Sequence, residues 1–362
     1  YLGRALKDFA RREEVVVATK FLPRTQAEIE SGVSGQEHIQ KMLDKSLRNL
    51  GMDYVDLYIY HMWDYQTPLI DIMDGLNRAV KAGKVRYIGI SNCFAWQLCK
   101  ANALAEREGW AKFVSIQGHY NLIFREEERE MIPFCREENI ALTPYSALAG
   151  GRLAKQPGET SRRLEKDSYA HLKYDATQAQ DAQVIDRVHA LAQRRGTSMT
   201  AVSLAWLMAK GAVPVVGMTK PRHVEGAVDA SALTLTEAEI AWLEEPYVPH
   251  ALVGVMAQNT TTAAKEPHVW STGNQNICPR AVCAEKHSFR RNDTVKKLFA
   301  FILALALCAA SAFAEATPQP SPEAAFTPTD STILVACFSA TDNTWPLAEY
   351  AAASLNADLF RI

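Results

Sequence analysis

Two ionisable side chains stand at the ends of two apolar segments near the start of the chain. Lys20 belongs to the tract VVVATKF at residues 15–21, and His61 follows the tract YIY at residues 58–60. Apolar runs of this length, rich in β-branched and aromatic residues, are typical of buried strands in a parallel sheet. Parallel α/β barrels carry their catalytic side chains at the carboxyl ends of the strands. A lysine and a histidine placed there are therefore candidates for an active site.

The elements that must position these residues alternate along residues 1 to about 255. Strands are predicted at 15–19, 55–61, 85–91, 114–118, 140–146 and 213–217, and helices at 36–50, 68–82, 95–108, 126–138, 181–195 and 200–209. Gly83 and Gly196 stand where helices are expected to end. Alternating strands and helices imply a parallel sheet covered by helices. The pattern predicts an α/β fold with six of the eight units of a (β/α)8 barrel.

Composition excludes some classes of function. The chain has 362 residues and a net charge of −2, which argues against a nucleic-acid-binding surface. Its seven cysteines form no CxxC pair and no paired metal spacing, so no metal site is predicted. The cysteines before residue 255 are interpreted as reduced residues of a cytoplasmic protein.

The sequence changes character after Val255. Residues 256–293 follow neither structural period and are interpreted as irregular or disordered. Lys296 and Lys297 precede the apolar run 298–310 and an Ala-Phe-Ala triplet, so 294–314 is predicted to be a signal peptide, with a short membrane or core helix as the alternative. Residues 315–332 are typical of a linker. We expect residues 256–332 to make no stable contacts with the barrel.

The last residues, 333–362, begin with the tract ILVACFSATDNT. An apolar strand running into a hydroxyl-rich loop resembles the first βα unit of flavodoxin-like proteins, whose loop wraps the phosphate of FMN. Ser339, Thr341, Asn343 and Thr344 match that loop, whereas Asp342 departs from it. FMN is expected only for a completed domain of this kind. We interpret the chain as two neighbouring truncated genes joined together, the second of which would be exported if made from its own start; the alternative is a genuine reductase–flavodoxin fusion.

Eight tracts in the first 250 residues carry a second resemblance. They are LGRAL (2–6), VVVATKF (15–21), LGMDYVDLYIYH (50–61), GKVRYIGISN (83–92), SIQGHYNL (115–122), TPYSALAGGRL (143–153), VPVVGMTKP (213–221) and EEPYVPH (244–250). Their order resembles the aldo-keto reductases, particularly bacterial members of the group that includes the potassium-channel β subunits. The resemblance implies strands three to eight of the family's barrel, with the first two βα units missing.

The resemblance also implies a site. Lys20 matches the family's catalytic lysine and His61 its catalytic histidine, whereas His119 is interpreted as structural. The implied cofactor-binding residues are Ser91, Asn92 and Gln117 for the nicotinamide carboxamide, Tyr145 for ring stacking, Ser146, Ala147, Leu148, Gly150 and Arg152 for the pyrophosphate, and Thr219 and Lys220 for the 2′-phosphate, with Gly217 as a further cofactor contact. Arg163 either adds charge there or belongs to a solvated loop. Gly226 and Ala227 stand where relatives often have Glu and Asn at the adenine.

The resemblance implies an NADPH-dependent oxidoreductase that reduces small-molecule aldehydes or ketones, without nucleic-acid or membrane partners. The family's proton-donating tyrosine and its aspartate lie in a DTAxxYG tract, which does not occur in these 362 residues. We therefore expect the chain as written to be inactive. The alternative is a non-catalytic NADPH-binding partner protein of the channel β-subunit type. Substrate identity and oligomeric state are left open.

Overall fold

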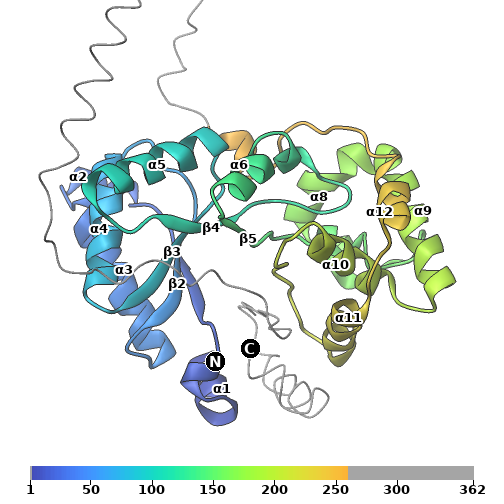
Figure 1. Cartoon of the computed structure of the whole chain (residues 1–362), viewed down its shortest axis with the longest axis horizontal. Coiled ribbons are helices and arrows are strands. Elements are labelled where there is room, and N and C mark those ends of the chain that lie inside the picture. Colours follow the sequence, from blue (N-terminus) through green and yellow to red (C-terminus); the bar gives the residue numbers. More distant parts are fainter. Residues whose placement is uncertain (1, 260–362) are drawn as a thin grey trace, which may run out of the picture. The chain divides into compact units, whose positions relative to one another are not determined.

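The computed structural model describes residues 2–259, which contain a parallel five-stranded sheet in the order β1-β2-β3-β4-β5 (Figure 1). Its strands are β1 (Ala18–Phe21), β2 (Val55–Tyr60), β3 (Val85–Ser91), β4 (Phe113–Gln117) and β5 (Ala141–Leu142). The spatial order repeats the chain order, as expected when each strand returns through a helix to its neighbour. All strands therefore end at the same edge of the sheet.

The helices between the strands cover one face of this sheet. They are α2 (Gln26–Glu30), α3 (Gly35–Leu50), α4 (Leu69–Lys81), α5 (Ala95–Glu108) and α6 (Met131–Glu137), and α1 (Leu2–Phe9) precedes them. Their ends are encoded locally. Ser34 and Glu37 form a capping box at the start of α3, and Gly51 ends the helix in the left-handed conformation.

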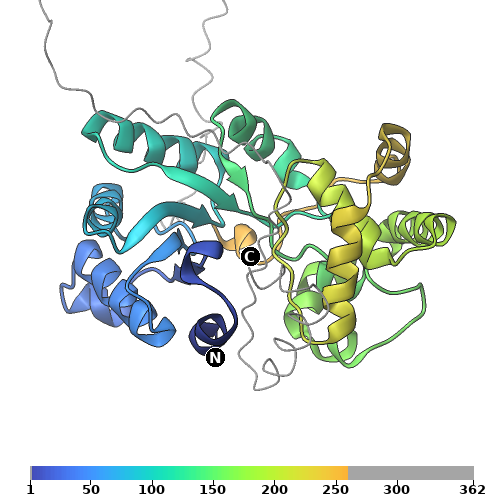
Figure 2. The same cartoon turned by 60° about the horizontal axis from the view of Figure 1, so that its bottom comes forward.

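The second half of the described chain is mostly helical. It contains α7 (Arg162–Lys166), α8 (Ser168–Tyr174), α9 (Gln178–Arg195), α10 (Met199–Ala209), α11 (Pro221–Ala232) and α12 (Glu237–Glu244). Figure 2 shows α9 to α12, in light green to gold, grouped on the side of the molecule opposite α3 and α4. Helix α10 is apolar around most of its circumference, and the side chain of Trp206 is fully buried. This helix therefore forms the centre of the second half.

Five of the six predicted helices are confirmed, whereas the one predicted at 126–138 is an α-helix only at Met131–Glu137, and three strand predictions also need correction. The first strand is β1 at residues 18–21 rather than 15–19, and the predicted strand 140–146 is reduced to β5. The prediction of a regular strand at 213–217 is wrong, although Val213 and Val215 donate backbone hydrogen bonds to Leu142 and Pro144 at 2.8 and 2.9 Å. Pro144 and Pro214 lack an N–H group, which shortens the ladder. Within residues 2–259 the sheet is an open arc, consistent with part of a (β/α)8 barrel.

The two faces of the sheet have different surroundings. One apolar cluster lies between the sheet and helices α3 to α6 and includes Tyr58 and Ile88; a second surrounds Trp206. On the opposite face Ala18, Leu57 and Ile59 form a small separate cluster. The strand register pairs Ala18 with Leu57 and Lys20 with Ile59, which places Lys20 on this same face.

The packed region extends slightly beyond the predicted limit. Met256 is buried, and the Asn259 side chain exchanges hydrogen bonds with Gln97 and accepts one from Tyr65 at 2.9 Å. The segment, orange in Figure 1, lies at the first turn of α5. The expectation that residues after Val255 make no contact with the barrel is therefore wrong for 256–259. The predicted signal peptide, linker and flavodoxin-like unit lie outside the described residues.

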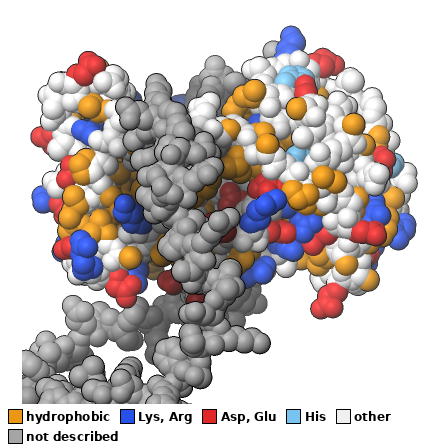
Figure 3. All heavy atoms as spheres, turned by 90° about the horizontal axis from the view of Figure 1, so that it is seen from above, with side chains coloured by type: hydrophobic (Ala, Val, Ile, Leu, Met, Phe, Trp, Pro, Cys, Tyr) orange, Lys and Arg blue, Asp and Glu red, His pale blue; other side chains and the backbone are white. Residues whose placement is uncertain are grey.

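The surface offers no dominant patch of one charge on the face shown in Figure 3, where acidic and basic side chains alternate with apolar ones. Within the described part of the chain, no helix is both long and apolar enough to cross a bilayer. No group of three or more potential metal ligands occurs in that part either.

Candidate active site

Lys20 lies at the third position of β1 and points along the sheet face toward the end of β4. Its ammonium donates a hydrogen bond to Oε1 of Gln117, the last residue of β4. Burial lowers the pKa of Lys20, because the charged form loses hydration. This shift makes the lysine a better proton donor than a solvated one.

His61 directly follows β2, and its backbone N–H donates to the carbonyl of Phe21 at 3.0 Å. The pKa of His61 is lowered, first by burial and then by the positive charge of Lys20. The imidazole is therefore neutral at physiological pH and can donate or accept one hydrogen bond without carrying charge.

Asn92 connects three strand ends. Its amide nitrogen donates to the carbonyl of His61 and to the hydroxyl of Ser91, both at 2.9 Å, and its amide oxygen accepts from the Tyr145 hydroxyl at 2.9 Å. Ser91 in turn donates to the carbonyl of Gln117 at 2.7 Å. Asn92 has a left-handed backbone (φ 50°), a conformation that asparagine tolerates better than most residues. These bonds hold the side chains of Ser91, Asn92 and Tyr145 together at the carboxyl edge.

Tyr145 is the outer member of an aromatic stack. Its ring centroid lies 5.6 Å from that of His119, which stacks on Phe124 at 4.0 Å on its other side. His119 accepts or donates at Nε2 to the Tyr174 hydroxyl at 2.7 Å. Burial, followed by the charge of Lys173, lowers its pKa well below the usual range, so the imidazole is neutral. His119 therefore supports the Tyr145 ring, in agreement with its interpretation as structural.

The segment after Tyr145 has an unusual backbone. Ser146 and Ala149 have φ values of 57° and 49°, and Gly150 and Gly151 have 67° and 108°. The carbonyl of Ser146 accepts from Nδ2 of Asn121 at 3.0 Å. Left-handed residues in a row open the chain into a turn that brings backbone close to a neighbouring group. Ala147, Leu148, Gly150 and Arg152 all lie in this turn.

Arg152 is the last residue of this segment, and only some of the N–H groups of its guanidinium have hydrogen-bond acceptors. Nη2 donates to Asp175 at 2.5 Å, and the guanidinium lies over the Tyr174 ring at 5.1 Å. Its Nη1 is buried and has no hydrogen-bond partner among residues 2–259. A buried guanidinium N–H without an acceptor is costly unless an anion completes it.

The residues predicted for the 2′-phosphate follow Val215, whose backbone N–H donates to the carbonyl of Pro144 at 2.9 Å. Gly217, Thr219 and Lys220 are exposed and precede α11; Lys220 occupies its N-cap position and Pro221 its first turn. The Thr219 N–H donates to His223 at 3.1 Å. Arg163, predicted in a loop, lies in the short helix α7.

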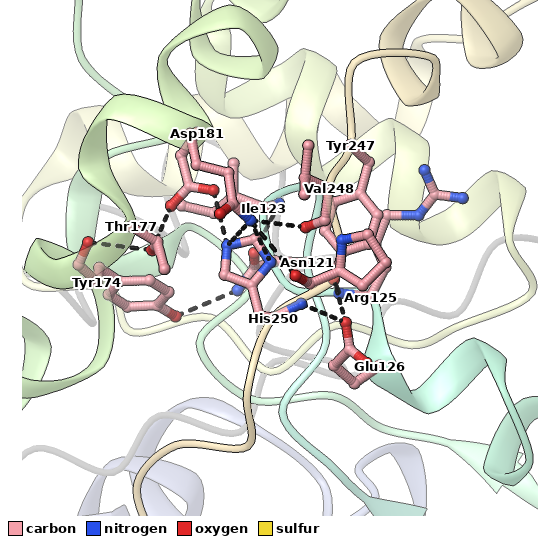
Figure 4. Close-up of polar contacts among 12 residues, drawn as sticks. Asn121, Ile123, Arg125, Glu126, Tyr174, Thr177, Asp181, Tyr247, Val248 and His250 are labelled. Carbon is pink, nitrogen blue, oxygen red and sulfur yellow. Dashed lines mark hydrogen bonds and ion pairs between the residues drawn. The ribbon is translucent and has the colours of Figure 1, made fainter.

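Figure 4 shows a second polar cluster, in which residues 247–250 contact the loop after β4 and helix α9. The Tyr247 hydroxyl donates to Glu126 and accepts from the N–H of Arg125, at 2.7 and 2.8 Å. His250 pairs with Asp181 of α9 at 2.8 Å, and both side chains are almost fully buried. The His250 ring also contacts Phe124, with centroids 6.0 Å apart. The tract EEPYVPH thus contacts the loop after β4 through Tyr247 and helix α9 through His250.

Sequence reasoning missed Lys173 and Asn121, both of which contact Ser146. Lys173 is an isolated lysine on a helix, which ordinarily indicates a solvated position. Its aromatic neighbours Tyr169 and Tyr174 were the available signal of a packed environment.

Comparison with known proteins identifies the family. Residues 1–247 match the model of the aldo/keto reductase family, and the chain belongs to this family of oxidoreductases. Members generally use NAD(P)H and act on small molecules.

Individual relatives agree with this assignment. The chain is 39% identical over 215 residues to the putative aryl-alcohol dehydrogenase AAD16 of Saccharomyces cerevisiae, covering 59% of this chain and 63% of that protein. It is 37% identical over 272 residues to the versiconal hemiacetal acetate reductase of Aspergillus parasiticus, covering 69% and 79%. Against AAD16 and an aldo-keto reductase of Fusarium vanettenii, the chain spans 63% and 58% of their lengths.

The fold resembles that of a solved enzyme. A thermostable aldo-keto reductase, crystallised with the inhibitor epalrestat, matches with a TM-score of 0.54 and 25% identity. The match covers 68% of this chain and 76% of that one.

Proposed function

We propose that residues 1–250 carry the cofactor-binding part of the active site of an NADPH-dependent carbonyl reductase. The observation that supports this most directly is the set of bonds joining Lys20 to Gln117, Asn92 to His61 and Tyr145 to Asn92. These side chains come from four strand ends and one following loop. In a parallel α/β fold this edge is where substrates and cofactors bind.

The proposed nicotinamide site consists of amides and one ring. Asn92 and Gln117 offer carbonyl and amide groups complementary to a carboxamide, and Ser91 adds a hydroxyl. Tyr145 offers a flat ring whose position the stack on His119 fixes. When bound, NADPH would supply the hydride, and these residues would decide which face of its ring is presented.

The proposed phosphate contacts lie farther along the chain. The turn at 146–152, with the buried Nη1 of Arg152, suits the pyrophosphate. Thr219, Lys220 and the N-terminal end of α11 suit the 2′-phosphate, which favours NADPH over NADH. Arg163 is proposed as an additional cation there.

Lys20 and His61 are proposed to act on the carbonyl. A neutral His61 would donate a hydrogen bond to the carbonyl oxygen, and the positive charge of Lys20 would stabilise an alkoxide that forms beside it. In the family a tyrosine from a DTAxxYG tract protonates that oxygen. No such tract is present among these residues, so we propose that the chain as written has negligible reductase activity.

The missing tract favours a second candidate, a non-catalytic NADPH-binding protein. Titration of the 362-residue chain with NADPH, followed by nucleotide fluorescence, tests binding. An NADPH-oxidation assay with an aromatic aldehyde tests turnover. Binding without turnover supports a binding protein or an incomplete enzyme, turnover refutes the proposed inactivity, and absence of binding refutes the cofactor site.

A further inference from the structure

Lys173 of α8 carries a buried ammonium beside the proposed pyrophosphate turn. The residue is 4% exposed, and its Nζ donates to the hydroxyl of Ser146 at 2.7 Å. The ammonium also lies 5.1 Å from the ring centroids of Tyr145 and Tyr174 and 5.3 Å from that of Tyr169. Three tyrosine rings and a hydroxyl therefore fix a positive charge at the first residue of the turn.

A second cation reaches the same place from the other end of the turn. The Arg152 guanidinium and the Lys173 ammonium both lie 5.1 Å from the ring centroid of Tyr174. The buried Nη1 of Arg152 lies 3.3 Å from the position that a Cβ on Gly150 would occupy, so it points at the backbone of the turn. Two cations fixed around one ring, one with an unsatisfied buried N–H, form an environment that favours an anion.

The backbone of the turn between these two cations packs closely against α8. Ala149, Gly150 and Gly151 have consecutive positive φ values, and a side chain on Gly150 would approach Ala170 of α8 to 2.9 Å. The backbone is thus held close to α8, while Asn121 holds the carbonyl of Ser146. A hydroxyl, an ammonium and a guanidinium along a tight turn are donors typical of a phosphate site.

We infer that Lys173 binds the pyrophosphate of the dinucleotide cofactor together with Arg152. The inference rests on the proposed function and adds a residue to it from an element that the resemblance did not implicate. The pyrophosphate is common to NADPH and NADH, whereas the 2′-phosphate is not. A pyrophosphate contact must therefore contribute equally to both nucleotides.

The experiment measures Kd for NADPH and NADH by fluorescence titration of the full chain and its variants. Lys173→Met removes the charge and keeps a long unbranched side chain, and we expect binding of both nucleotides to weaken by a similar factor of about 10 to 100. Lys220→Met is the matched contrast, and we expect it to weaken NADPH alone. Lys166→Met, an exposed lysine on α7, is the control and should change neither.

Two further measurements separate charge from structure. The affinity of the parent should fall more steeply with salt than that of Lys173→Met, because one ion pair is lost. Lys173→Gln, which retains a donor for Ser146, replaces Lys173→Met if thermal melting shows that the latter does not fold, and it should show the same loss.

The outcomes are distinguishable. A parent that binds neither nucleotide overturns the proposed function itself. A parent that binds, with folded Lys173 variants of unchanged affinity, overturns only the role of Lys173. A loss confined to NADPH would assign Lys173 to the 2′-phosphate and would also contradict the inference.

Discussion

Glu127, in the loop after β4, is expected to make the protein less stable as the pH rises. Its carboxylate lies against the backbone of Gly118, with Oε1 3.0 Å from the position that a Cβ on that residue would occupy. The surrounding pocket is formed by Ile116, Gly118, Tyr120, Met131, Ile132, Leu142, Thr143 and Pro144. Burial among these residues, and then the charge of Glu126, raises the pKa of Glu127 to about 8.

The sign of the effect follows from proton linkage. The folded protein holds the Glu127 proton more tightly than the unfolded chain, whose carboxyl has a pKa of 4.5. The neutral carboxyl is thus tolerated below pH 4.5, and stability falls progressively between pH 4.5 and about 8. At 1.36 kcal/mol per pKa unit the loss has an upper bound of about 5 kcal/mol. The Glu127 side chain is only partly buried, so water screens its charge. We therefore expect the free energy of unfolding to fall by about 1–3 kcal/mol over this pH range.

Glu127→Gln removes the charge and keeps the shape. Urea unfolding followed by tryptophan fluorescence should show the variant about 1–3 kcal/mol more stable than the parent at pH 8.5, with a much smaller difference at pH 5. Glu137→Gln, an exposed change of the same charge on α6, should have no such effect. A Glu127→Gln variant with the pH dependence of the parent, or one less stable at pH 8.5, would refute the reasoning.

Three other outcomes are expected. Asp56 is 4% exposed and pairs with Arg12 at 2.7 Å and Arg86 at 2.9 Å, so Asp56→Asn should reduce the free energy of unfolding by about 3 kcal/mol in urea, whereas the exposed Asp53→Asn should not. Purified protein should oxidise NADPH with an aromatic aldehyde at well below 1 turnover per second, because general acid catalysis alone contributes about 10²–10⁴-fold. Limited proteolysis should cut between residues 260 and 332 before it cuts the barrel; a resistant full-length chain would contradict the joined-gene interpretation.

Local signals predicted most of the helices between the strands. Gly196, where a helix is expected to end, terminates α9 in the left-handed conformation. Strand periodicity likewise placed Lys20 and His61 near the same edge of the sheet. It failed at 213–217, because the prolines at 144 and 214 remove ladder hydrogen bonds that a hydrophobic pattern does not reveal.

Contacts between distant residues could not be predicted. Lys20 and Gln117 are 97 positions apart, and their hydrogen bond depends on the register of the intervening strands β2 and β3. The docking of Asn259 on Gln97 is also a long-range contact, 162 positions apart, at the end of a segment with no helical or strand period. Lys173 had no periodic signal either, since its burial depends on three rings from two separate segments.

The hydrogen bonds of the candidate site have a consequence for the proposed cofactor binding. The side-chain amide oxygen of Gln117 already accepts a hydrogen bond from Lys20. The side-chain amide oxygen of Asn92 already accepts one from the Tyr145 hydroxyl. A nicotinamide carboxamide bound to either amide would have to share or replace these bonds, so the net gain from each amide is smaller than that of a new hydrogen bond. Within residues 2–259 the Nη1 of Arg152 makes no hydrogen bond, so a bound phosphate would not have to replace one there. The phosphate contacts, rather than the nicotinamide contacts, should therefore dominate the affinity, which is why Lys173 and Arg152 are the decisive positions to test.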